Sequence, residues 1–146
     1  IKSSAASDVY KRQAPKKVIE ILNGMKEELL CIRGNCDCEV DQMVLKFPIL
    51  ADYAAFWLGD LMVWATHGHV YNMNNLPPFK KGDILLHGHT HIPAAQSFGD
   101  GYYYINPGSL SIPKEGSKNS YMILEGRTFT LKSVEDGSVI SSFTVE

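Results

Sequence analysis

The sequence predicts an α/β protein of two packed sheets, the first mixed and the second antiparallel, with helices on the outside. Two features of the 146 residues support this fold class. The first half combines a helical apolar period with short apolar runs that end in turn residues. The part after His91 consists of short alternating runs separated by glycine turns, which is typical of successive hairpins.

A short amphipathic helix is expected at 16–26, because apolar residues recur there at helical spacing (Val18, Ile21, Leu22 and Met25). The apolar run 29–33 predicts a buried strand, and Gly34-Asn35-Cys36-Asp37 ends it with turn residues. Helix, strand and turn together correspond to the second half of a βαβ unit. Segment 40–47 is apolar at mixed spacing, which is compatible with a short helix or a loop.

Hairpins account for most of the chain after position 52. Segments 53–58 and 61–66 are separated by Gly59-Asp60 and are expected to pair as antiparallel strands. Segment 72–83 is rich in Asn, Pro and Lys and predicts a surface loop. Further strands are expected at 94–98, 102–105, 121–125, 128–134 and 139–145.

The composition is that of an ordinary globular domain, with 45% hydrophobic and 21% charged residues. A net charge of -2 gives no basic surface for nucleic acid or for an anionic membrane. The sequence has neither an apolar run of membrane-spanning length nor a signal-peptide pattern. The three cysteines (Cys31, Cys36 and Cys38) are crowded together, which indicates reduced thiols and a cytoplasmic location.

The first residues differ from the rest. Positions 1–13 are small and polar without an apolar period, so we expect a disordered or artefactual leader there. Positions 8–13 also resemble the translated end of a transposon used in sequencing libraries. We therefore expect 14–146 to be the C-terminal part of a single domain.

All five histidines lie between positions 67 and 91, in two clusters that share one pattern. Each cluster follows an apolar run of β type, at 61–64 and at 84–86, and contains His-Gly-His. The carboxyl ends of strands form ligand-binding crevices in α/β sheets, and neutral imidazole is the commonest ligand for divalent first-row metals. A single histidine is more often structural, but this arrangement favours half of a metal site.

Four short motifs resemble those of the calcineurin-like metallophosphoesterases, above all the small YfcE-type bacterial phosphodiesterases. They are Gly34-Asn35-Cys36-Asp37, Thr66-His67-Gly68-His69, Gly88-His89-Thr90-His91 and Asn106-Pro107-Gly108-Ser109. Each motif alone would be weak, but four in order at fitting intervals are specific. The resemblance implies a two-sheet αββα sandwich of the metallophosphoesterase type that lacks its N-terminal βαβ portion.

The resemblance also implies two divalent metal ions, with Mn²⁺ as the first choice and Fe, Zn²⁺ or Ni²⁺ as alternatives. Asn35, His67 and His89 correspond to ligands of one ion, and His91 corresponds to a ligand of the other. The remaining family motifs, an Asp-x-His and a Gly-Asp that bridges both metals, would lie upstream of position 14 and are absent here. Gly59-Asp60 is not a substitute, because it follows the Gly-Asn motif inside a hairpin turn.

In this family, two metal ions activate a hydroxide and hold the phosphoryl oxygens during in-line attack. The resemblance therefore implies a phosphodiesterase for small phosphodiester or phosphomonoester substrates. Aryl leaving groups should be favoured, because Cys36 stands where many relatives have a proton-donating histidine, and His69 is a candidate replacement donor. Since half of the ligand set is missing, we expect this chain alone to bind metal weakly and to hydrolyse little.

Alternatives remain open at several points. A chain without the bridging carboxylate is also compatible with a non-catalytic scaffold of this fold that binds partner proteins, and a homo-oligomer is compatible with either function. Cys36 and Cys38 are conceivable zinc ligands, although they lack the paired spacing of structural zinc sites. Asn106-Pro107-Gly108-Ser109 is either only a turn or one wall of a phosphate site.

Overall fold

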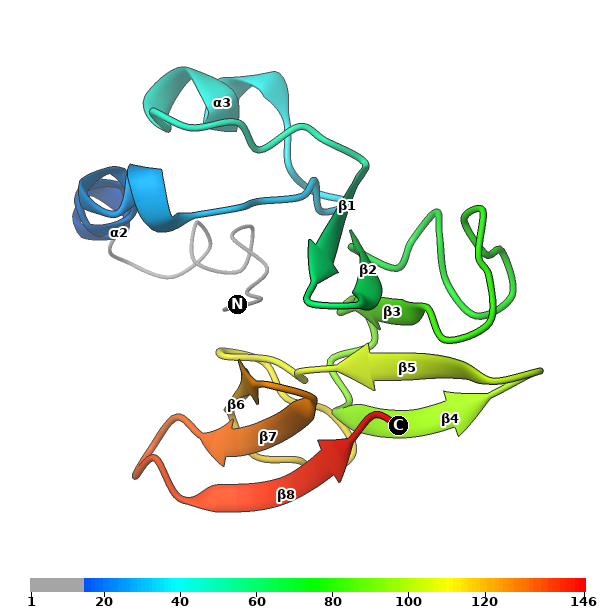
Figure 1. Ribbon diagram of the computed structural model, residues 1–146. Coiled ribbons are helices and arrows are strands. Elements are labelled where there is room, and N and C mark those ends of the chain that lie inside the picture. Colours follow the sequence, from blue (N-terminus) through cyan, green and yellow to red (C-terminus); the bar gives the residue numbers. More distant parts are fainter. Residues whose placement is uncertain (1–14) are drawn as a thin grey trace.

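The computed structural model describes residues 15–146, so the leader expected at 1–13 lies outside the described residues (Figure 1). No helix of this described part is long and apolar enough to cross a membrane. The elements in chain order are α2 (Pro15–Gly24), the 3-10 helix η1 (Lys26–Glu28), α3 (Glu39–Val44), β1 (Tyr53–Leu58), β2 (Leu61–Thr66), β3 (Ile84–His87), β4 (Ala94–Phe98), β5 (Tyr102–Asn106), β6 (Ser120–Glu125), β7 (Thr128–Ser133) and β8 (Val139–Thr144).

The predicted first helix is present as α2, and it packs on a small hydrophobic cluster of its own. The members of this cluster are the buried Leu45, Phe47 and Ile49 and the partly buried Ile19, Leu22, Leu29, Cys31 and Leu50. Helix α2 ends at Gly24, two residues before the expected end, where glycine is a poor helix former. In Figure 1, α2 and α3 lie together, away from the two sheets.

The ambiguous segment 40–47 starts as a helix and ends as an extended chain, because α3 covers only Glu39–Val44. The backbone N–H of Cys38 donates to Asp41 Oδ2 at 2.9 Å, which closes the first turn. The side chain of Gln42 then holds the chain after α3, because it donates to the carbonyl of Phe47 at 2.9 Å and accepts from the N–H of Ile49 at 3.0 Å. This brace directs the apolar residues after α3 into the small cluster.

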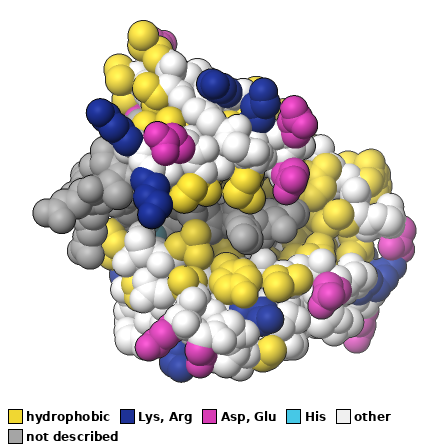
Figure 2. Space-filling model, turned by 90° about the vertical axis from the view of Figure 1, so that its left-hand side faces the viewer, with side chains coloured by type: hydrophobic (Ala, Val, Ile, Leu, Met, Phe, Trp, Pro, Cys, Tyr) yellow, Lys and Arg dark blue, Asp and Glu magenta, His cyan; other side chains and the backbone are white. Residues whose placement is uncertain are grey.

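The prediction of a strand at 29–33 is wrong. The segment is extended, but within the described part of the chain it pairs with no strand, and its one bond of strand type joins Arg33 N–H to the carbonyl of Ala51 at 2.7 Å. A strand needs a ladder of backbone partners, and an apolar run alone cannot supply them. One consequence is that Leu30 is 62% exposed. Figure 2 shows further hydrophobic side chains exposed on this face of the molecule.

The first sheet is mixed, as expected, with strand order β1-β2-β3-β5-β4. Antiparallel hairpins form its two margins, where β1 pairs with β2 and β4 with β5, at bounds within one residue of those predicted. Parallel pairs form its centre, where β3 lies between β2 and β5. The loop predicted at 72–83 connects β2 to β3, and it is anchored where Asp83 accepts from the Trp64 indole N–H at 3.3 Å.

The second sheet is an antiparallel β6-β7-β8 meander, again as expected, and the two sheets enclose the main core. Alternating residues of each strand face this core, which is the period of a sheet with one buried face. The buried members are Leu61, Val63, Ala65, Ile84, Leu86, Ile105, Met122, Phe129, Leu131 and Val145. Three of them, Val63, Ile84 and Ile105, are completely buried on the three central strands of the first sheet.

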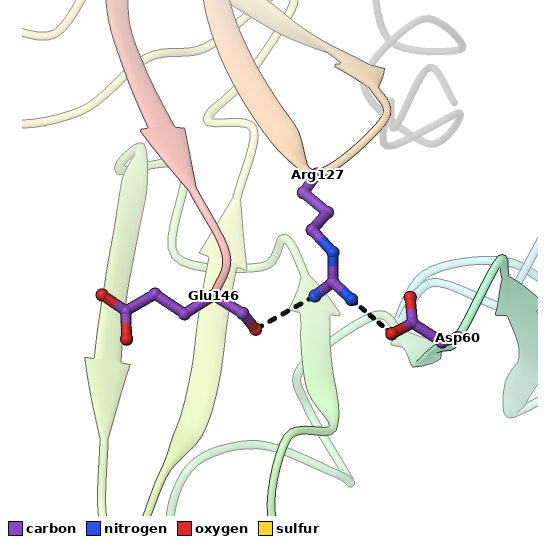
Figure 3. A network of polar contacts seen from close by, with 3 residues as sticks. All are labelled: Asp60, Arg127 and Glu146. Carbon is purple, nitrogen blue, oxygen red and sulfur yellow. Dashed lines mark hydrogen bonds and ion pairs between the residues drawn. The ribbon is translucent and has the colours of Figure 1, made fainter.

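A surface contact joins the two sheets at the turns (Figure 3). Arg127, in the β6–β7 turn, forms an ion pair with Asp60 in the β1–β2 turn and donates to the carbonyl of Glu146 at 3.0 Å. Both side chains of the ion pair are exposed, so the pair stabilises the fold by at most about 1 kcal/mol. Asp60 lies at the end of the hairpin remote from Thr66, so it is also remote from the first histidine cluster.

Replacing Ile105 by alanine is expected to lower the free energy of unfolding by about 2–5 kcal/mol, because it leaves a cavity at a fully buried position between the sheets. The matched control is Ile140→Ala on β8, where the same side chain is 42% exposed and the loss should stay below about 1 kcal/mol. Urea denaturation of both variants measures the difference. Equal losses would show that the main core does not carry the stability of the fold.

Candidate metal centre

The two histidine clusters meet because β2 and β3 are parallel neighbours. Thr66, the last residue of β2, is the register partner of His87, the last residue of β3. The chain leaves both strands at the same edge of the sheet, so the residues just beyond the strands, including His67 and His89, emerge side by side. This arrangement is the crevice at the carboxyl ends of strands that the sequence pattern predicted.

Three predicted ligands converge at this edge. Asn35 Oδ1 lies 2.9 Å from His67 Nε2, and His67 Nε2 lies 3.2 Å from His89 Nδ1. Donor atoms that share one first-row metal ion at about 2.0–2.2 Å lie roughly 2.8–3.5 Å apart. Both distances therefore fit donor atoms of a common divalent ion. Counting only His, Cys, Asp and Glu side chains, no group of three or more in residues 15–146 is placed to hold a metal. The trio described here includes the amide of Asn35.

His69 borders this trio. Its ring centroid is 5.2 Å from that of His67 and 6.3 Å from that of His89, and its side chain is exposed. Cys36 is also exposed, and its Sγ lies 3.5 Å from Asn35 Nδ2. Cys38 is turned to α3 instead, where its Sγ contacts Asp41 Oδ2 at 3.2 Å, so the two cysteines do not face one another as a zinc pair.

His91 is oriented by the backbone rather than by the other histidines. Its Nδ1 lies 2.7 Å from the carbonyl oxygen of Ile112. A carbonyl only accepts, so Nδ1 carries the proton, and Nε2 is left with a free lone pair. In the described part of the chain, no hydrogen bond joins His91 to Asn35, His67 or His89. The structure thus brings three of the four predicted ligands together and leaves His91 beside them.

The turn after β3 has an unusual backbone. His89 and His91 have φ values of 66° and 63°, which is the left-handed region that side chains with a Cβ rarely adopt. Each such residue costs of order 1–2 kcal/mol, and it persists only where the surrounding structure holds it. Such strain is common at functional sites, because there the direction of a side chain matters more than local stability.

The electrostatics of the cluster favour the neutral form of three imidazoles, those of His67, His87 and His89. Burial, and after it the neighbouring imidazoles, lower the pKa of His67 to about 4. Burial also lowers the pKa of His87 and His89. Neutral rings retain the lone pairs that a metal requires, so the cluster is prepared for a cation at neutral pH.

His87 belongs to the motif by sequence but not to the trio. It is 4% exposed, its ring lies against Tyr104 with centroids 4.7 Å apart, and its Nδ1 contacts the carbonyl of Gly88 at 3.0 Å. A Cβ placed on Gly68 would come within 2.5 Å of that same Nδ1. The His87 ring therefore packs directly against the backbone between His67 and His69 and supports that turn.

Comparison with known proteins agrees with this fold. Residues 5–128 match the calcineurin-like phosphoesterase superfamily domain. The chain belongs to this superfamily.

One relative is phosphodiesterase YfcE of Escherichia coli K12, which is 41% identical over 132 residues, 90% of this chain and 71% of that protein. The solved structure of the E. coli phosphoesterase Yfce aligns with a TM-score of 0.86 and covers 91% of this chain and 72% of that one. A probable metallophosphoesterase of Bacillus subtilis, YsnB, is 26% identical over 138 residues, 73% of this chain and 81% of that protein. The fold predicted from the motifs, a two-sheet structure of the metallophosphoesterase type, is confirmed.

The metal-free protein should lose stability as the pH falls from about 6.5 to about 4. An unfolded histidine has a pKa of about 6.5, whereas His67 in the folded state has a pKa of about 4, so in this window the unfolded chain binds more protons. The stabilisation is complete above pH 6.5 and lost below 4, and partial exposure limits it to about 1–2 kcal/mol. The midpoint of urea denaturation, measured with EDTA across this pH range, should change less with pH in His67→Gln than in wild type. The exposed His69→Gln is the control and should keep most of the pH dependence.

Gly68→Ala should damage the site more than the fold. Gly68 has φ of 109°, and the added Cβ would meet His87 Nδ1 at 2.5 Å, so the turn between His67 and His69 has to move. The control is Gly116→Ala, which has φ of 71° but no atom near the added Cβ, so it carries the backbone cost alone. We expect Mn²⁺ affinity to fall at least tenfold in Gly68→Ala and to stay within a factor of about two in Gly116→Ala.

Proposed function

We propose that this chain supplies one half of the dinuclear metal centre of a phosphodiesterase. Asn35 Oδ1, His67 Nε2 and His89 Nδ1 would hold one divalent ion, and His91 Nε2 would contribute to a second. The observation that carries the proposal is the convergence of the first three atoms, with His67 Nε2 2.9 Å from Asn35 Oδ1 and 3.2 Å from His89 Nδ1. Family membership and the name of the E. coli relative support the phosphodiester chemistry.

Imidazole nitrogen is a ligand of intermediate hardness and amide oxygen is a hard one, a combination that suits Mn²⁺, Fe, Zn²⁺ or Ni²⁺, and we propose Mn²⁺ first. When bound, two such ions lower the pKa of a water and neutralise charge on the phosphoryl oxygens. The protein's part is to present neutral imidazoles, since burial and neighbouring rings lower the pKa of His67 to about 4. The Ile112 carbonyl fixes the tautomer of His91, so its free nitrogen is the one available to a metal.

We propose His69 as the group that protonates the leaving oxygen. Its ring lies 5.2 Å from that of His67 yet is open to solvent, so it is close to the cluster and still able to exchange protons. Cys36 is the second candidate, because its exposed thiol lies beside Asn35. Without a histidine at that position, substrates with good leaving groups, such as aryl phosphodiesters and monoesters, fit best.

The crowded cysteines support a cytoplasmic location, which we also propose. The scaffold alternative is not favoured. The relative at 41% identity is a phosphodiesterase by name, and three candidate ligands lie at mutual metal-site spacing, which a scaffold would not require.

Mn²⁺ titration of the 146-residue chain, followed by electron paramagnetic resonance, tests the ligand set. Asn35→Ala and His67→Ala should each lower the affinity at least tenfold, because each removes a donor atom. The matched control is Asn74→Ala, an exposed asparagine of the β2–β3 loop, which should leave the affinity unchanged. Equal affinity of Asn35→Ala and Asn74→Ala would refute the proposed site.

Hydrolysis tests the role of His69. We expect slow hydrolysis of bis(p-nitrophenyl) phosphate by this chain with Mn²⁺, because the described residues bring only three candidate ligands together. His69→Gln should lower the rate by about 10²-fold or more on an alkyl ester and much less on the aryl ester, since a poor leaving group depends more on a proton donor. An equal loss on both esters would exclude His69 as the donor.

A further inference from the structure

A buried asparagine behind the histidines has more partners than a turn requires. Asn106, the last residue of β5, has no exposed surface. Its Nδ2 lies 3.1 Å from the carbonyl of Gly88, 2.9 Å from Thr90 Oγ1 and 2.9 Å from the hydroxyl of Tyr104. Its Oδ1 accepts the N–H of Gly108 at 2.9 Å. One amide thus joins the turn after β3 to the loop after β5.

The partners of Asn106 lie on the two residues that alternate with the strained histidines. Gly88 precedes His89, and Thr90 stands between His89 and His91, both of which are left-handed. The N–H of Thr90 also donates to the carbonyl of Gly88 at 2.8 Å. The Asn106 amide therefore binds a turn that has a backbone hydrogen bond of its own. Holding Gly88 and Thr90 in place fixes the direction in which the two histidine side chains leave the backbone.

The loop after β5 is packed tightly against β6. Gly108 has φ of 78°, and a Cβ there would come within 2.3 Å of Ser120 Oγ, so only glycine fits. The hydroxyl of Ser120 donates to the carbonyl of Pro107 at 2.9 Å, and its side chain is 1% exposed. Ser120 thus holds the loop after β5 to β6 through contacts that do not involve the Asn106 side chain.

Among side chains of this size and shape, only an amide meets these hydrogen-bonding requirements. The site needs N–H donors for a carbonyl and a hydroxyl together with one acceptor for a backbone N–H, and asparagine provides both. Aspartate has the same shape, but when it is ionised it offers no donor. Complete burial also separates Asn106 from any substrate, which excludes the interpretation of this residue as a wall of the phosphate site.

We propose that Asn106 is a positioning residue that holds the turn 88–91 in the conformation that presents His89 and His91 to metal. It acts through Gly88 and Thr90 and touches neither a metal nor a substrate. The metal-binding part of this inference rests on the proposed function, whereas the ordering of the turn does not.

Two variants and one control test the inference. Asn106→Asp removes the donors at constant shape, and Thr90→Val removes an acceptor hydroxyl from an exposed residue without disturbing the buried asparagine. Ser120→Ala is the control, because it removes a buried hydrogen bond from the same loop but leaves the contacts of Asn106 intact. The readouts are amide hydrogen exchange in the metal-free protein and the Mn²⁺ dissociation constant.

We expect exchange at the amides of 89–91 to rise at least tenfold in Asn106→Asp and about threefold in Thr90→Val, with Mn²⁺ affinity falling by about 10- to 100-fold and 3- to 10-fold, respectively. Ser120→Ala should lower the denaturation midpoint while both readouts stay within a factor of two of wild type.

Unchanged exchange in the two test variants, or an equal loss of affinity in Ser120→Ala, overturns the inference. If Asn106→Asp fails to fold, Thr90→Val decides it by the same criteria. If wild type binds no Mn²⁺, the proposed function fails, and the exchange data alone still decide whether Asn106 orders the turn.

Discussion

The parallel pairing of β2 with β3 is the constraint on which the candidate site depends. The register that sets Thr66 beside His87 makes two strands end at one edge, so two histidine turns that are 20 residues apart leave the sheet side by side. Parallel strands with buried faces are held by apolar residues, and Val63 and Ile84 are completely buried in these two strands. The core of the protein and the geometry of the site are therefore set by the same strands.

Each histidine turn has a rigid support beneath it. The buried His87 ring packs against Gly68 in the first turn, and the buried Asn106 amide holds the second. Both supports lie in the sheet, whereas the ligating groups lie in turns outside it. This division allows two left-handed residues, His89 and His91, to persist in a turn that would relax if it were isolated.

The sequence predicted most of the sheets because their signals are local. Alternation of apolar residues and glycine turns placed the β1–β2 and β4–β5 hairpins to within one residue. The prediction of a strand at 29–33 was wrong because a run of apolar residues predicts burial but does not identify a partner strand. In the structure Leu29 and Cys31 pack on the helical cluster, and only Arg33 makes a bond of strand type, to Ala51.

By itself, the sequence determined most of the secondary elements, the two-sheet class and the identity of the metal-ligand candidates, since residue type and spacing are enough for these. The tertiary structure alone decided which nitrogen of His91 is available, that His87 supports the site rather than joining the trio, and that Asn106 reaches the histidine turn. The physical reason is distance along the chain. Asn35 and His67 are 32 positions apart, and Asn106 and Thr90 are 16 apart, so no local pattern could place their side chains within hydrogen-bonding distance.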